Sequence, residues 1–384
     1  MGSWAHRIYA CLSSVRLTVA LLALAVVLVF WGTMAQVTQG LYKAQNDFFR
    51  SFFVYWQPAW SAWRVPIFPG GYLLGWLMVA NLLAAHFRYY QPSRRKIGIV
   101  LIHSGILVLL VGQLLTDLLA VESQLHLRHG ETKNYSEASR EFELAIVDTT
   151  TPERDTVVAI SQHRLARGGD VEIATLPFTV RIREYLPNSS LTDRPTEGYR
   201  PIPATTGFGT GLWWRRLPLE TDPDRRDVPS AVVELVTREG SLGRYVVSGY
   251  FTRPHELTHD GRTYRMELRQ TRYYKPFFIT LLEFRHDRYP GTEIPKNFSS
   301  RIRIVRPATG EDREVLIYMN NPLRYFGETY YQASFDPDDQ GTVLQVVRNP
   351  SWLAPYFGCV IVTVGMMIQF GQHLTGWLAR RRPA

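Results

Sequence analysis

The sequence predicts a membrane protein of the α+β class, with four transmembrane helices and a large β-rich domain inserted between the third and the fourth. Four segments, at about 17–36, 71–90, 97–119 and 352–373, are apolar and long enough to cross a bilayer as helices. The region between the last two lacks such a segment and carries short runs of β-branched and aromatic residues. The surplus of positive charge lies beside the apolar segments, as is typical of membrane proteins.

These observations divide the 384 residues into three parts. We expect a membrane region at 1–121 with the first three helices, an extracytoplasmic β-rich domain at 122–350, and the fourth helix with a basic tail at 351–384. The mean hydropathy of -0.12 is near that of a soluble protein because the polar insert offsets the helices. The first apolar segment is longer than the core of a usual signal peptide and no A-x-A motif follows it, so we expect it to stay as a helix.

The net charge of +9 predicts the orientation in the membrane. Segments 1–16, 88–96 and 371–384 hold nine basic residues and no acidic one, and the rest of the chain balances at 34 of each sign. The nine are Arg7, Arg16, Arg88, Arg94, Arg95, Lys96, Arg380, Arg381 and Arg382. By the positive-inside rule both termini are cytoplasmic and the insert is outside, in a multi-pass protein of the bacterial cytoplasmic (inner) membrane. The charge is thereby explained by the lipid bilayer, and we expect no nucleic-acid partner.

The first outer loop, 36–70, carries Trp56, Trp60 and Trp63 at helical spacing. Tryptophan is enriched at the membrane–water boundary. We favour an interfacial aromatic belt over a binding surface for this loop.

The insert predicts a sandwich- or barrel-like β domain, since its strands have no helix between them. The expected strands are 142–149, 178–186, 231–237, 277–284, 301–305, 314–320, 329–335 and 342–348. A hairpin is expected around 307–312, where Pro and Gly follow one strand and precede the next. Residues 187–230 are rich in Pro, Gly, Thr and Arg, and we expect a long irregular loop there.

Several function classes are excluded or disfavoured. The two cysteines, Cys11 and Cys359, lie outside the exported domain and form no C-x-x-C motif, which argues against a thiol-disulfide role. No phosphate-binding loop, G-x-S-x-G or H-E-x-x-H motif is present. The histidines of the insert are scattered, so we expect solvated loop residues rather than a metal site. They are His126, His129, His163, His255, His259 and His286.

His103 is the main candidate functional residue, because an ionisable ring inside an apolar span is costly and tends to be functional. Its neighbours Ser104 and Gly105 are small and leave room for a flat ligand or another helix. The alternative is a packing role, in which the neutral ring hydrogen-bonds to Ser104 or Asn81.

His86 and His103 lie at similar distances from the turn that joins their helices, within about one helical turn of the same depth. Two imidazoles at one depth can ligate a haem iron axially. His86 can equally lie at the lipid headgroups, since Phe87 and Arg88 follow it, and the same alternative holds for His373.

With these residues in view, the chain resembles the ResB/CcsB family of cytochrome c biogenesis proteins. SVRLTVALLALAVVLVFWGTMAQ (14–36) is similar to the family's first span, and KIGIVLIHSG (96–105) resembles its Lys-x-Gly…His-x-Gly segment. In the insert, IPKNFSSRIRIV (294–305) resembles the Pro-x-x-Phe-x-Ser strand, and YMNNPLRYFGETYYQASF (318–335) resembles the Asn-x-Pro-x-x-Tyr-x-Gly…Tyr-Gln stretch. RNPSWLAPYFGCVIVTVGMMIQF (348–370) is similar to the lead into the last span, with Asn349 where Asp is usual.

The resemblance implies a haem-handling role. Proteins of this family act with a CcsA/ResC-type membrane partner to move b-type haem outward and deliver it to apocytochrome c. It implies that His103 is an axial ligand of the haem iron; for His86 only the depth argument applies. The partner's tryptophan-rich segment is absent, because Arg215 and Arg216 follow Trp213 and Trp214.

We therefore expect a non-catalytic subunit of a haem transport and cytochrome c–haem lyase complex, with the porphyrin between spans two to four and the β domain docking the partner. Two alternatives remain open. One is a b-type haem electron carrier that uses His86 and His103 together, and the other is a structural adaptor without haem.

Overall fold

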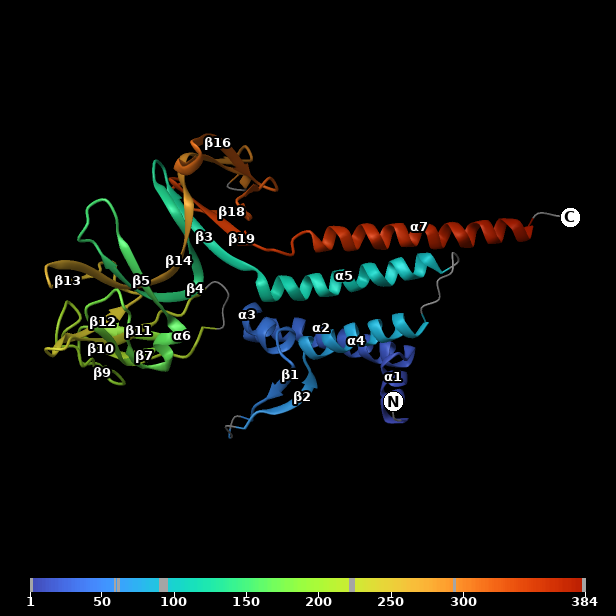
Figure 1. The fold of residues 1–384 in the computed structure, drawn as a ribbon, viewed down its shortest axis with the longest axis horizontal. Coiled ribbons are helices and arrows are strands. Elements are labelled where there is room, and N and C mark those ends of the chain that lie inside the picture. Colours follow the sequence, from blue (N-terminus) through green and yellow to red (C-terminus); the bar gives the residue numbers. More distant parts are fainter. Residues whose placement is uncertain are drawn as a thin grey trace. The chain divides into compact units, whose positions relative to one another are not determined.

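The computed structural model describes residues 3–58, 60, 63–89, 96–220, 225–292 and 295–381 (Figure 1). The described chain forms two compact units. A helical unit contains residues up to 121 and from 348 onward, and a β unit contains 122–220 and 225–347. Expectations that fall on 90–95, 221–224 and 382, including Arg94, Arg95 and Arg382, lie outside the described residues.

The helical unit is built from apolar helices whose ends are set by local sequence. Ser14 caps its longest N-terminal helix by accepting a hydrogen bond from the amide of Arg16 at 3.2 Å, and Gly40 ends that helix with a φ of 80°. The elements are α1 (Ser3–Leu12), α2 (Val15–Gln39), α3 (Leu41–Ala44), a π-helix (Gln45–Phe49), β1 (Phe53–Trp56), β2 (Val65–Pro69), α4 (Gly71–Tyr89), α5 (Ile97–Leu119) and α7 (Ala354–Arg381).

Three helices are long and apolar enough to cross a membrane: Val15–Gln39, Ile97–Leu119 and Ala354–Arg380. The second expected segment also forms a helix, the 19-residue α4. α4 contains the polar residues Asn81, His86 and Arg88 and is not among these three, so its crossing stays a prediction.

A row of glycines packs α5 tightly against α7, which runs antiparallel to it (Figure 1). Gly98, Gly105 and Gly112 are the buried residues of α5 and repeat every seven positions. A Cβ added to Gly98 would lie 2.9 Å from the carbonyl oxygen of Gly365, and one added to Gly105 would lie 2.9 Å from that of Gly358. Small residues allow such backbone approach between membrane helices. We call this contact the glycine seam.

The aromatic loop forms a β-hairpin and not a helix, so the helical spacing of its tryptophans does not reflect the local structure. β1 and β2 pair antiparallel, with Trp56 opposite Val65. Trp60 and Trp63 lie between the strands, and the side chains of Trp56, Trp60 and Trp63 are 54%, 86% and 80% exposed. The interfacial-belt interpretation stays a prediction for these exposed rings.

The β unit is β-rich, as the sequence predicts, and contains one short helix, α6 (Gln162–Arg167). Its strands are β3 (Val121–Arg128), β4 (Thr132–Asp148), β5 (Thr156–Ser161), β6 (Gly169–Val171), β7 (Thr179–Leu186), β8 (Ser189–Thr192), β9 (Arg200–Pro201), β10 (Trp213–Arg216), β11 (Ser230–Val236), β12 (Ser241–Ser248), β13 (His255–His259), β14 (Arg262–Arg288), β15 (Pro295–Arg306), β16 (Glu311–Tyr318), β17 (Leu323–Tyr325), β18 (Glu328–Phe335) and β19 (Gly341–Arg348). The expected hairpin at 307–312 is present, where β15 pairs antiparallel with β16.

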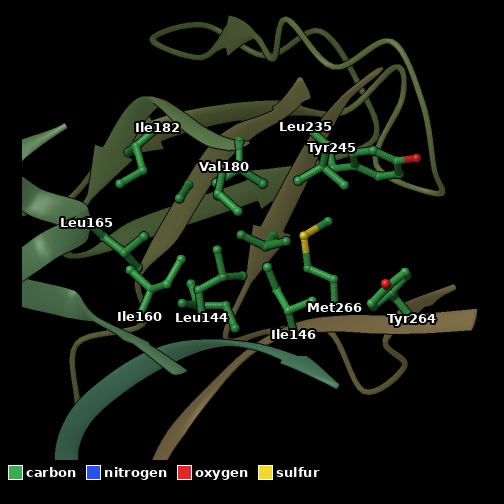
Figure 2. Close-up of a cluster of buried hydrophobic side chains, with 14 of the residues drawn as sticks. Leu144, Ile146, Ile160, Leu165, Val180, Ile182, Leu235, Tyr245, Tyr264 and Met266 are labelled. Atoms are coloured by element: carbon green, nitrogen blue, oxygen red, sulfur yellow. The ribbon is translucent and has the colours of Figure 1, made fainter. Parts of the chain in front are cut away.

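The first core of the β unit lies between two sheets (Figure 2). Val180 and Ile182 of β7 alternate toward it, as do Leu144 and Ile146 of β4. Strands β12, β11, β7 and β6 form one sheet, and β4, β5, β13 and β14 belong to the other. This half of the domain is therefore sandwich-like.

The second core is enclosed by one curled sheet in the order β16-β15-β14-β4-β3-β19-β18-β17. Ile317 of β16 and Leu323 of β17, from the two ends of that order, belong to the same buried cluster as Phe277 and Tyr330. The 27-residue strand β14 contributes to both cores and joins the two halves.

The expectation of an irregular loop at 187–230 is wrong in part. β8, β10 and β9 form a three-stranded sheet within it. Its Trp214 is fully buried and packs with Val232 of β11 and Val246 of β12. The reason is that β11 is buried on both faces, so a second layer is needed to cover the face that points away from the first core.

Candidate ligand site in the helical unit

His86 and His103 line the same cavity in the helical unit. Its volume is about 440 Å³, within the range of about 300–1,000 Å³ typical of ligand pockets. The wall is mostly apolar and comes from α2, α4 and α5. Its lining residues are Val15, Thr18, Leu22, Met78, Asn81, Leu82, Ala85, His86, Tyr89, Lys96, Ile99, Val100, His103, Ile106 and Leu110. We call it the histidine cavity.

The glycine seam sets the direction in which His103 points. Gly98 and Gly105 face α7, and at 100° per residue His103 lies roughly 140–160° around α5 from both. The ring is therefore directed away from α7 and toward the cavity. Gly105 admits a neighbouring helix and not a flat ligand, which settles one of the two uses expected for it.

Asn81, one of the two hydrogen-bond partners in the packing alternative for His103, bonds to other residues. Asn81 is 2% exposed, and its amide is satisfied by the turn between α1 and α2. Its Oδ1 accepts a hydrogen bond from Thr18 at 2.7 Å, and its Nδ2 donates to the carbonyl oxygens of Leu12 and Ser14 at 2.6 and 3.2 Å. Among the residues that the structure describes, none hydrogen-bonds to the ring of His103.

His373 is not part of the histidine cavity. It lies on α7, where Nε2 of Gln369 donates a hydrogen bond to its Nε2 across 2.8 Å. No residue of α7 is among those that line the cavity. The expected wall of spans two to four is therefore wrong for this cavity, which uses the first three helices because α7 occupies the opposite face of α5.

Three histidines of the insert make contacts within the fold, whereas the sequence predicts solvated loop residues. His255 is 3% exposed, and its Nε2 donates to the carbonyl oxygen of Val246 at 2.7 Å. Burial lowers the pKa of His255 and outweighs that hydrogen bond. His126 and His286 pair with Asp336 and Asp339, at 2.8 and 3.0 Å. Within the described ranges no group of three or more His, Cys, Asp or Glu is placed to hold a metal ion.

Residues 256–342 match the model of the ResB-like family. That match shows that this part of the chain is similar to the ResB-like family. The chain is also similar to Protein NrfI of Wolinella succinogenes, with 34% identity over 92 residues, which is 24% of this chain and 10% of that protein. The chain thus matches about a tenth of the length of this curated relative.

The ResB-like segment runs from β13 to the start of β19, so the match lies in the β unit and not in the histidine cavity. Its motifs build the second core. Phe326 and Gly327 have φ angles of 51° and 77° and form the tight turn between β17 and β18. Tyr330 is fully buried, and its hydroxyl donates to Glu328 at 2.7 Å. Lys275, 4% exposed, completes this buried group by an ion pair with Glu328 at 2.6 Å.

Proposed function

We propose that this chain is a membrane protein of cytochrome c biogenesis that handles haem through His103. With a CcsA/ResC-type partner it would deliver haem to apocytochrome c outside the cytoplasm, as a non-catalytic subunit. The observation that carries the proposal is the presence of two imidazoles on one apolar cavity in a chain with a ResB-like segment.

The residues of the histidine cavity fit a b-type haem. Imidazole is a common axial ligand of haem iron, and apolar side chains suit the porphyrin ring. When bound, the haem would supply an iron centre that His103 would ligate, with His86 as a candidate second ligand. Lys96 lines the same cavity and provides a charge opposite to that of the porphyrin carboxylates. The dry walls would keep the haem out of the lipid.

The proposed topology has four spans, with α4 as the second. The basic residues beside the helices favour cytoplasmic termini, a cytoplasmic turn between α4 and α5, and a β unit on the outer side. The His86 and His103 ends of their helices then lie in the cytoplasmic half of the bilayer. A haem bound there would be at the side on which it is made.

The absorption spectrum of the purified full chain tests this proposal, with haem added and with or without a co-expressed CcsA-type partner. His103→Ala is expected to remove the Soret band, or to shift its wavelength because a weaker ligand replaces the imidazole. His373→Ala is the matched control, because it removes a histidine near the same helix ends that does not line the cavity. A Soret band unchanged in His103→Ala would refute the ligand assignment.

The shared cavity also favours a second candidate, the b-type haem electron carrier. It predicts that the chain binds haem without a partner and that His86→Ala and His103→Ala weaken the band equally. If no variant or preparation binds haem and cytochrome c maturation tolerates His103→Ala, the adaptor interpretation is correct.

A further inference from the structure

A second cavity, of about 470 Å³, lies in the helical unit and shares Leu110 with the histidine cavity. Its apolar wall includes Phe49 of the π-helix, Trp76 of α4 and Leu114 of α5. Its polar side chains are Gln45, Arg50, Tyr72, Gln113 and Asp117. π-Helical turns are rare and frequently occur at functional sites, and this one places Gln45 and Phe49 on the cavity. We call it the triad cavity, after Arg50, Tyr72 and Asp117.

The charge of the triad cavity is balanced. Nε of Arg50 contacts Oδ1 of Asp117 at 2.9 Å, and the hydroxyl of Tyr72 donates to Oδ2 of the same carboxylate. The Asp117 side chain is 16% exposed, although it belongs to an apolar helix in which a lone carboxylate is costly. An anionic ligand would compete with Asp117 for Arg50 and leave that carboxylate without its cationic partner. The cavity therefore favours a ligand with a neutral head group.

Two amides of the triad cavity lack partners. Gln113 lies in the apolar helix α5 and Gln45 in the π-helix, and both are exposed residues that line the cavity. In the described part of the chain, neither side-chain amide makes a hydrogen bond. Polar groups without partners are unfavourable in an apolar environment, so a ligand that offers carbonyl oxygens would satisfy them.

The wall of the cavity has room for a flat ring. Phe49 and Trp76 both line it, and aromatic side chains stack on planar ligands. Gly75 lies on the same wall, and a Cβ added there would meet no atom within 4 Å. Because α5 is an apolar membrane-length helix, the ligand must also be soluble in lipid.

We propose that the triad cavity binds a neutral, flat, lipid-soluble carbonyl compound of the quinone class. Its ring would lie between the aromatic side chains, and its carbonyl oxygens would accept hydrogen bonds from the amides of Gln45 and Gln113 and from the outer nitrogens of Arg50. Its tail would follow the apolar wall. The assignment goes beyond haem handling and does not depend on His103.

The test is a titration of the purified full chain in detergent with a benzoquinone that carries a decyl tail, followed by quenching of tryptophan fluorescence. Trp76→Phe identifies the share of the signal that arises at the cavity. Gly75→Leu fills the open space and is expected to abolish saturable quenching, without harm to folding because leucine is the better helix former. Gly371→Leu is the matched control, since Gly371 of α7 also faces open space but lies outside the cavity. Gln113→Leu should weaken binding by about two- to tenfold, the value of one hydrogen bond.

Three results would overturn the proposal. Gly75→Leu could bind the quinone as tightly as the Gly371→Leu control. Dodecanoate could displace the quinone at equal concentration, which would indicate an anionic head group. Native mass spectrometry could find a phospholipid in the wild type that Gly75→Leu loses, with no saturable quinone binding. In His103→Ala quinone binding is expected to persist, which separates this test from that of haem.

Discussion

The glycine seam allows a quantitative test of what orients His103. In Gly105→Ala the new Cβ would lie 2.6 Å from Cγ2 of Val362 and 2.9 Å from both the amide nitrogen of Val362 and the carbonyl oxygen of Gly358. A side chain can rotate, but the two backbone atoms move only with α7. The helices must separate by about 0.5 Å for these contacts to reach the 3.4 Å of ordinary van der Waals contact, and such a gap removes about a quarter of the attraction along the seam.

We expect this overpacking to destabilise the helical unit by about 1–3 kcal/mol relative to Gly75→Ala. The comparison isolates the steric effect, because both variants gain the same helix propensity while Gly75 faces open space. For a unit of this size the difference corresponds to about 2–4 °C in Tm per kcal/mol.

An environment-sensitive dye on Cys11 and Cys359 can follow this unfolding, since both cysteines are exposed and lie on helices α1 and α7. Haem binding through His103 should weaken in the same variant, because the seam no longer fixes the rotation of α5. A Tm for Gly105→Ala equal to or above that of Gly75→Ala would refute the close contact.

Three further predictions concern other parts of the chain. Lys275→Met should destabilise the β unit by about 3–5 kcal/mol in denaturant unfolding by leaving Glu328 unpaired, and adding Glu328→Gln should restore most of the loss. Burial lowers the pKa of His255, so between that lowered pKa and the unfolded value of about 6.5 the folded state binds fewer protons than the unfolded state. Stability should fall as the pH drops through that value, and a His255→Gln variant with the same pH dependence as wild type would contradict this linkage. In Cys359→Ser, an impermeant maleimide should label Cys11 only after the membrane is opened; labelling of intact cells would place the N-terminus outside.

The helices and most strands of the chain follow from local pattern. Long apolar segments gave the positions of α2, α4, α5 and α7, and β-branched runs gave strands such as β7 and β19. The covering sheet of 187–230 was not predicted because its strands are short and irregular in sequence. A signal for it exists in β11, where the consecutive apolar residues Ala231, Val232 and Val233 indicate burial on both faces.

From the sequence alone, residue counts along two helices predict that His86 and His103 lie within about one helical turn of the same depth. The sequence could not determine whether the two rings face each other, since rotation is set by contacts between helices. Only the tertiary structure decided this, through the glycine seam, which commits one side of α5 to α7 and leaves His103 on the other. The triad cavity was unpredictable for the same reason, because Arg50, Tyr72 and Asp117 are distant in sequence and meet only when the turn after α2 packs against α4 and α5.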